Sequence, residues 1–238
     1  KEDGGWSLEL IDPENICGEE NNWTASEDIK GGTPGKQNSV LTNKPDLTGP
    51  MLLSVSVLQS NQLLLTFDEK LEKEISIASF ELTHSATVDK VYFNNKALRE
   101  IKLELLTGLS NRELYSITIK NLRDCSGNPI QEEFNTLRFA LPEKADSTDV
   151  LINEILFNPR ANGVDFLEIY NNSLKYINLK NWKLANTENG ILENEKQITT
   201  ENFILAPFTY LALTDDPEVI KNGYPNNSDG EFLKSTLP

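Results

Sequence analysis

The feature that most constrains this chain is a series of short strand-like runs between residues 149 and 184. Apolar and β-branched residues gather in three runs, at 150–157, 166–170 and 176–184. Within the second run, Leu167 and Ile169 alternate with Glu168, which is the period of a strand with one buried face. The breaks between runs carry Asn-Pro, Asn-Gly and Asn-Asn-Ser, which favour tight turns. The pattern predicts a meander of antiparallel strands, and hence an all-β sandwich.

A second set of alternating runs spans residues 45–142. The runs lie roughly ten residues apart, which is the spacing of strands in a sandwich. They are centred on residues 53–57, 63–67, 101–105 and 115–119. Pro45, Gly49 and Pro50 mark the start of this region, and the polar residues 143–148 form a linker after it. We therefore expect two β-sandwiches in tandem, at 45–142 and at 149–238.

The C-terminal motifs resemble one known family. INEILFNP, DFLEIYNNS and INLKNWKL follow one another as the opening strands of a lamin tail domain do. Acidic and Asn positions match as well as apolar ones, and the resemblance covers residues 148–238. It implies an immunoglobulin-like β-sandwich, incomplete at its C-terminus, of the kind found in secreted and surface proteins of bacteria. It implies a module and no activity.

Residues 1–44 resemble the closing segment of the same domain type, through GWSLELIDPENICG, NNWTAS and GGTPGKQNS. Because unpaired strand edges seek partners, two arrangements follow. Residues 6–11 either complete the C-terminal domain of their own chain, which we expect, or exchange with a neighbour in a strand-swapped homodimer. A start at Lys1, with Met51 as the only methionine, indicates a piece of a longer protein.

The middle region, residues 45–142, resembles a bacterial Ig-like domain of the S-layer and adhesin type. TFDEKLEKEISIASFEL carries the F-x-E strand end of that type, and YSITIKNLRDCSGNPI carries its D-x-x-G-N turn. The resemblances together predict two immunoglobulin-like β-sandwiches in tandem.

Charge and hydropathy exclude two classes of partner. The chain has 22 Lys and Arg against 37 Asp and Glu, a net charge of −15, which opposes binding of a phosphate backbone. No run approaches the ~20 apolar residues of a membrane-spanning helix. Asp146-Ser147-Thr148 resembles an O-glycosylation acceptor of Gram-negative surface proteins. We expect export to the cell surface or periplasm of a Gram-negative bacterium.

Cys17 and Cys125 are the only cysteines, 108 positions apart. A bridge between them would stabilise the fold by about 4–5 kcal/mol in the chain-entropy model. The residues alone slightly favour two free thiols, whereas an exported protein favours the disulfide.

The sequence lacks the usual catalytic and cofactor motifs. His84, the only histidine, lies in an expected strand at 80–85 with no nucleophile elbow near it. One His and two distant Cys cannot assemble a usual zinc site. No phosphate-binding loop, dinucleotide fingerprint or HExxH occurs. We therefore predict no catalytic, cofactor-binding or metal-binding residues and no cofactor.

For some polar and aromatic residues, the sequence leaves a binding or catalytic role open beside a structural one. Glu154 and Glu168 could converge as a carboxylate pair, and Asn171 could bind a ligand, but we expect structural roles for all three. The loop NNSDGE fails as an EF-hand, because Pro225 and Thr236 would be its first and last ligands. A looser calcium site would use Asp215, Asp216 or Asp229, against a solvated loop. Trp6, Trp23 and Trp182 either pack or form a sugar-stacking platform.

The sequence therefore predicts a non-catalytic structural, adhesion or scaffold module with an unidentified protein or glycan partner. The alternative is an accessory polysaccharide-binding module of an extracellular hydrolase. A carboxylate hydrolase is a third reading, which requires two carboxyls roughly 5–10 Å apart in a cleft.

Overall fold

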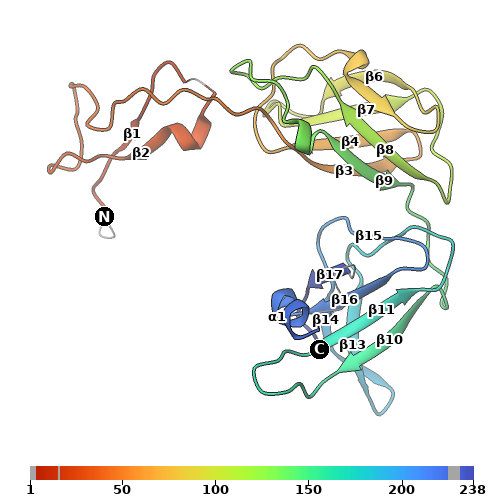
Figure 1. Cartoon of the computed structure of the whole chain (residues 1–238). Coiled ribbons are helices and arrows are strands. Elements are labelled where there is room, and N and C mark those ends of the chain that lie inside the picture. Colours follow the sequence, from red (N-terminus) through yellow and green to blue (C-terminus); the bar gives the residue numbers. More distant parts are fainter. Residues whose placement is uncertain (1–3, 16, 225–230) are drawn as a thin grey trace. The chain divides into compact units, whose positions relative to one another are not determined.

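The computed structural model describes residues 4–15, 17–224 and 231–238. The chain divides into two compact units. The N-terminal unit comprises residues 1–108 and 116–138, and the C-terminal unit comprises residues 109–115 and 139–238. Strands make up most of the regular structure in both units (Figure 1), which confirms the predicted all-β class. None of the helices in the described residues has the length and apolar character that crossing a membrane requires.

Most of the N-terminal unit consists of two sheets. A four-stranded sheet has the order β3-β4-β7-β6, and a three-stranded sheet has the order β5-β8-β9. The elements are β3 (Leu52–Gln59), β4 (Gln62–Phe67), the 3-10 helix η2 (Ile77–Ser79), β5 (Phe80–Leu82), β6 (Val88–Phe93), β7 (Glu100–Leu105), β8 (Leu114–Ile119), the 3-10 helix η3 (Glu132–Phe134) and β9 (Thr136–Ala140).

The alternation of apolar and polar residues along the strands determines which side chains form the core of these sheets. Strands β4 and β7 bury every second residue, as a strand with one core face must. Their buried side chains are Leu63, Leu65, Phe67, Ile101, Leu103 and Leu105, and Ile117 and Ile119 of β8 are also buried. Full burial of one such side chain stabilises the fold by about 1.5–3 kcal/mol. The runs predicted at 53–57, 63–67, 101–105 and 115–119 all lie within strands.

The N-terminal segment, residues 4–44, is built differently. Strand β1 (Leu8–Leu10) pairs antiparallel with β2 (Trp23–Ala25), and the 3-10 helix η1 (Glu19–Asn22) precedes β2. No large apolar side chain among the described residues of this segment is buried, and its buried side chains are polar: Glu9, Asp12, Asn22 and Ser26. Hydrogen bonds therefore hold the segment together in place of an apolar core.

The carboxylate of Glu9 is the centre of this polar interior. It accepts hydrogen bonds from the Thr33 hydroxyl (2.7 Å), the Ser39 backbone N–H (2.7 Å) and the Ser39 hydroxyl (2.8 Å). Burial acts to raise the pKa of Glu9, but the hydrogen bonds from Thr33, Ser39 and Ser26 outweigh it and lower the pKa to about 2. The charged form of Glu9 thus ties β1 to the loop at 31–39.

The expected completion of the C-terminal domain by residues 6–11 is not found. Strand β1 has β2 as its partner, whereas the four-stranded sheet of the C-terminal unit has the order β10-β11-β16-β17. The reason is local, because β2 follows β1 after a twelve-residue connection, 11–22, and closing it costs less entropy than pairing β1 with a strand of the C-terminal unit, which lies much further along the chain. Exchange of this segment with a neighbouring chain stays a prediction.

The C-terminal unit contains one four-stranded sheet and two short strand pairs, β12-β15 and β13-β14. Its elements are β10 (Val150–Leu156), β11 (Phe166–Asn171), β12 (Ile177–Asn178), β13 (Lys183–Glu188), β14 (Ile191–Gln197), β15 (Ile204–Leu205), β16 (Tyr210–Thr214), α1 (Pro217–Gly223) and β17 (Glu231–Lys234). Its core is formed by Leu167, Ile169, Ile177, Leu179, Ile198, Leu205, Leu211 and Leu213.

The predicted meander is correct for its first pair only. β10 pairs antiparallel with β11, but the other neighbour of β11 is β16, not the run at 176–184. That run divides into β12 and the start of β13, which pair with β15 and β14. Asn181 between them has φ +64°, so the chain turns there. Apolar spacing alone could not reveal this change of sheet.

Candidate functional site

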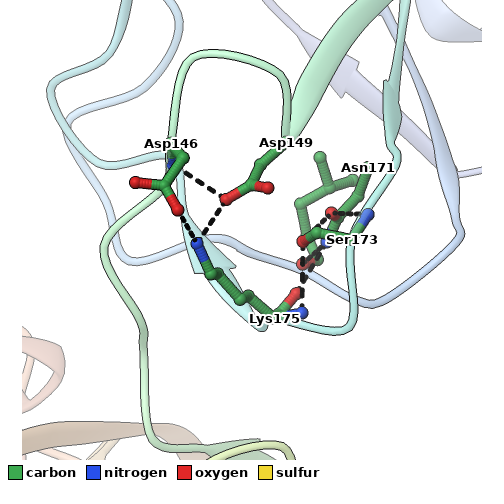
Figure 2. A network of polar contacts seen from close by, with 6 residues as sticks. Asp146, Asp149, Asn171, Ser173 and Lys175 are labelled. Carbon is green, nitrogen blue, oxygen red and sulfur yellow. Dashed lines mark hydrogen bonds and ion pairs between the residues drawn. The ribbon is translucent and has the colours of Figure 1, made fainter.

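A polar network fixes the beginning of the C-terminal unit (Figure 2). The Lys175 ammonium lies 2.6 Å from the carboxylate of Asp146 and 2.6 Å from that of Asp149. The same Asp149 oxygen accepts the backbone N–H of Asp146 at 2.7 Å. That backbone hydrogen bond, with the Lys175 ammonium second, lowers the pKa of Asp149. Residues 146–149 are thereby attached to the turn between β11 and β12.

Asn171 organises this turn from inside. Its side chain is fully buried, and its amide donates to the carbonyls of Lys175 (2.7 Å), Leu205 (3.1 Å) and Ala206 (2.9 Å). Its side-chain oxygen accepts the backbone N–H and the hydroxyl of Ser173. Every polar atom of the side chain is thus used within the fold. The structure gives Asn171 the role of ordering a turn, as expected. The two carboxylates around Lys175, for which the sequence analysis made no prediction, have a structural role as well.

A second polar site, the acidic pocket, lies in the N-terminal unit. It has a volume of about 370 Å³, and its lining includes Asp46, Glu69, Arg99 and Asn15. Asp46 and Glu69 each bring one carboxylate oxygen close to the carboxylate of Asp124, so that the three oxygens lie within 4.8 Å of one another. The amide oxygen of Asn15 is buried and has no hydrogen-bond partner among the described residues.

The turn at 124–128 holds Asp124 in place. Asp124 is 1% exposed and accepts the backbone N–H groups of Ser126 (2.9 Å) and Asn128 (2.7 Å). Gly127 has φ +94°, which suits glycine. The hydroxyl of Ser126 donates to Asp46 at 3.2 Å, which links the turn to the segment before β3. The D-x-x-G-N turn therefore fixes the carboxylate of Asp124 through hydrogen bonds from its own residues.

Crowding of carboxylates perturbs Glu69. Burial, followed by the charges of Asp46, Asp124 and Asp68, raises the pKa of Glu69 to about 7, and Arg99 opposes this. The Glu69 carboxyl therefore changes its charge near neutral pH. Carboxylate oxygens are the ligands that Ca²⁺ and Mg²⁺ prefer. The cluster could hold such a cation, but three carboxylates are fewer than the six to eight oxygens that Ca²⁺ takes.

Sequence reasoning missed this cluster, although its signals were present. Asp46, Glu69 and Asp124 come from three separate segments, and no spacing rule connects them. Glu69 ends the F-x-E motif, and Asp124 begins the D-x-x-G-N turn. Both motifs were identified as family features, but only the fold brings them together.

Cys17 and Cys125 form a disulfide, with their Cα atoms 5.8 Å apart. The two free thiols that the residues alone favoured are therefore not present in the structure. The bridge joins the N-terminal segment to the turn that carries Asp124. An ion pair between Glu19 and Arg99 also joins the N-terminal segment to the residue directly before β7.

Several other candidates lie apart from these sites. His84 is not in a strand, because β5 ends at Leu82 and His84 has φ +54° in the following turn. Glu154 and Glu168 face each other across β10 and β11. Glu168 accepts a hydrogen bond from Asn153 at 2.7 Å, as a surface carboxylate does.

The proposed calcium ligands near the C-terminus do not gather in the described residues. Asp216 caps α1 by accepting the backbone N–H groups of Glu218 and Val219. Asp215 is exposed, and Asp229 lies outside the described residues. Of the tryptophans, Trp182 packs against the C-terminal core, Trp6 is partly buried, and Trp23 is 49% exposed.

Comparison with solved structures found S-layer proteins. A structure of domains 1–6 of the surface layer protein SbsC is 21% identical, with 45% of this chain and 15% of that chain covered. The N-terminal part of the bacterial S-layer protein SbsC is 17% identical, with 68% and 44% covered. The S-layer protein rSbsC(31-844) is 14% identical, with 73% and 33% covered. All three TM-scores are 0.36, which is too low to assign a fold.

This chain thus spans less than half the length of each of these S-layer chains. Comparison with curated proteins found no match. The model of the lamin tail domain family matches residues 143–233, which confirms the resemblance predicted from the three motifs of that region.

Proposed function

We propose that this chain is a non-catalytic structural module of an exported bacterial surface protein, in the adhesion or scaffold class. The observation that carries the proposal is how the polar groups are used. Among the buried polar side chains of the C-terminal unit, Asn171 fixes a turn and Asp149 fixes the chain entry, and Asp124 of the N-terminal unit orders its own loop. A site built for catalysis would leave such groups free to meet a substrate.

Two further observations support the proposal. The match to the lamin tail domain covers the region that holds the Asn171 and Lys175 network. The Cys17–Cys125 bridge is of a kind that persists outside the reducing cytosol, which supports export. The domain boundaries at 44, 142 and 148 belong to the same proposal.

Surface display is tested by accessibility on intact cells. Protease added to cells of the source bacterium should digest this region, and antibodies to it should label unpermeabilised cells. The control is a cytosolic protein, which stays intact and unlabelled. Protection from protease together with labelling only after permeabilisation of the inner membrane would place the protein inside the cell and contradict the proposal.

The alternative function is polysaccharide binding by an accessory module. One observation favours it, the exposed ring of Trp23 on β2. A glycan array should then show binding that Trp23→Ala removes, whereas Trp182→Phe, at the packed tryptophan, leaves binding unchanged. Equal binding by wild type and Trp23→Ala would remove this alternative.

A further inference from the structure

The turn at residues 146–149 presents two hydroxyl groups to solvent, directly before β10. The backbone N–H of Asp149 donates to the Asp146 carbonyl at 3.1 Å, so Ser147 and Thr148 are the two central residues of a β-turn. Both residues are exposed, and neither hydroxyl has a hydrogen-bond partner among the described residues. A modifying enzyme could therefore reach either hydroxyl without unfolding any part of the chain.

Ion pairs hold this turn in place. The Lys175 ammonium contacts the carboxylates of Asp146 and Asp149, which stand at the two ends of the turn (Figure 2). The Asp149 carboxylate also accepts the backbone N–H of Asp146. The fold thus uses the side chains at both ends of the turn and leaves those of Ser147 and Thr148 unused.

The sequence of the turn is unique in this chain. Asp146-Ser147 is the only place in the 238 residues where Asp directly precedes Ser or Thr. These are the residues that resemble an O-glycosylation acceptor, and a three-residue pattern alone carries little weight. The structure adds that the pattern occupies an ordered, exposed turn with a free hydroxyl.

A hollow beside the turn distinguishes the two hydroxyl residues. It has a volume of about 420 Å³, and its lining includes Ser147, Ile177 and Trp182 but not Thr148. Sites that receive small molecules have volumes of about 300–1,000 Å³. Trp182 has an apolar ring and an N–H donor, which suit the apolar C–H faces and the hydroxyls of a sugar. A sugar attached to Ser147 therefore has a surface of this unit to pack against.

We propose that the Ser147 hydroxyl is the attachment site of an O-linked glycan. In the transfer, Ser147 Oγ forms a bond to the anomeric carbon of a sugar carried on a diphosphate donor. The bond from that carbon to the phosphate oxygen breaks, the diphosphate leaves, and a base of the glycosyltransferase takes the hydroxyl proton. The product is a surface module whose first sugar lies beside the entry to the C-terminal unit.

The charges around the turn favour a glycan over a phosphate. The carboxylates of Asp146 and Asp149 flank the hydroxyl, and a phosphate beside carboxylates is destabilised by like-charge repulsion. The whole chain carries a net charge of −15, which adds to this repulsion. A neutral sugar is free of this penalty and increases the solubility of an exposed surface.

The experiment is mass spectrometry of the protein purified from the source bacterium. Trypsin cleaves after Lys144 and Arg160, and the peptide 145–160 contains only two hydroxyl side chains, those of Ser147 and Thr148. Electron-transfer fragmentation breaks the backbone while the glycan stays attached, so it identifies the modified residue. Ser147→Ala and, as the matched control, Thr148→Ala are produced in the same bacterium.

We expect the wild-type and Thr148→Ala peptides to carry the added mass of one or more sugar residues. The Ser147→Ala peptide should have the mass of its sequence alone. An unmodified wild-type peptide, a phosphate in place of the glycan, a glycan on Thr148, or a glycan that persists in Ser147→Ala would overturn the proposal.

The inference rests on the export proposed above, so antibody labelling of intact cells is carried out on the same culture. Labelled cells with an unmodified peptide would refute the glycan and leave the surface function standing. Cells that are labelled only after permeabilisation of the inner membrane would refute the surface function itself.

Discussion

Removal of the Cys17–Cys125 bridge should release the N-terminal segment while the sheets of its unit stay folded. The perturbation is the double substitution Cys17→Ser and Cys125→Ser. The bridge is worth about 4–5 kcal/mol in the chain-entropy model when the whole 108-position loop unfolds, and about 3–4 kcal/mol when only the chain between Cys17 and β3 is released. Without the disulfide, hydrogen bonds are the main interactions that hold the N-terminal segment, because residues 4–44 bury no large apolar side chain among those described.

The other interactions that hold the N-terminal segment are weaker than the disulfide. The ion pair of Glu19 with Arg99 is partly exposed, and such pairs contribute about 0–1 kcal/mol. A two-stranded sheet such as β1–β2 is marginal by itself in water. The apolar core around Leu65 and Ile101, in contrast, does not involve the segment. We therefore expect local release before global unfolding.

Trypsin digestion followed by mass spectrometry is the first assay. Lys30 and Lys36 lie in the segment, and cleavage after them should be much faster in the double variant, while residues 52–138 stay intact. Urea unfolding is the second, monitored by tryptophan fluorescence because two of the three tryptophans, Trp6 and Trp23, lie in the segment. In the double variant, we expect an additional unfolding transition at low urea concentration. Glu19→Gln with the bridge intact is the control and should lose under about 1 kcal/mol.

Equal rates of cleavage after Lys30 with and without the bridge would refute this reasoning. So would a single urea transition whose midpoint is the same in both proteins. Either result would mean that the polar interior around Glu9 holds the segment without help from the disulfide.

Three further predictions concern single side chains, each measured by urea unfolding. The raised pKa of Glu69, about 7, means that the folded state retains a proton which the unfolded chain loses near its ordinary value of 4.5, so stability falls as pH rises between these values. Glu69→Gln should therefore stabilise the protein at pH 8 by about 1 kcal/mol, allowing for solvent screening, and change little at pH 4; the same gain at both pH values would contradict this. Asn171→Ala removes a fully buried side chain and its hydrogen bonds to the carbonyls of Lys175, Leu205 and Ala206, and should cost about 2–4 kcal/mol, against almost nothing for the exposed neighbour in Asn172→Ala; equal costs would show that the hydrogen bonds are not responsible. Gly49→Ala places a Cβ 1.7 Å from the Pro129 carbonyl oxygen and should cost about 1–3 kcal/mol, and a neutral effect would mean that the backbone moves freely there.

The sequence alone determined the fold class and most of the strands. Residues 63–67 and 101–105 alternate strictly, and alternation with period 2 identifies a strand whatever lies around it. The lamin tail motifs were readable for the same reason, because their apolar, acidic and Asn positions are local patterns. Turn chemistry around Asn171 was also predicted, since an Asn side chain hydrogen-bonds to nearby backbone groups.

The tertiary structure decided which strands pair and which polar groups meet. The run at 176–184 has the apolar residues of one strand, yet it is divided between two strand pairs, a choice that depends on pairing with residues 196–197 and 204–205. Asp46, Glu69 and Asp124 meet only because separate loops end at the same place. The bridge between Cys17 and Cys125 depends on a Cα separation of 5.8 Å, which no spacing of 108 positions can specify. Local periodicity can be recognised in the sequence, but proximity between distant segments is a property of the folded backbone.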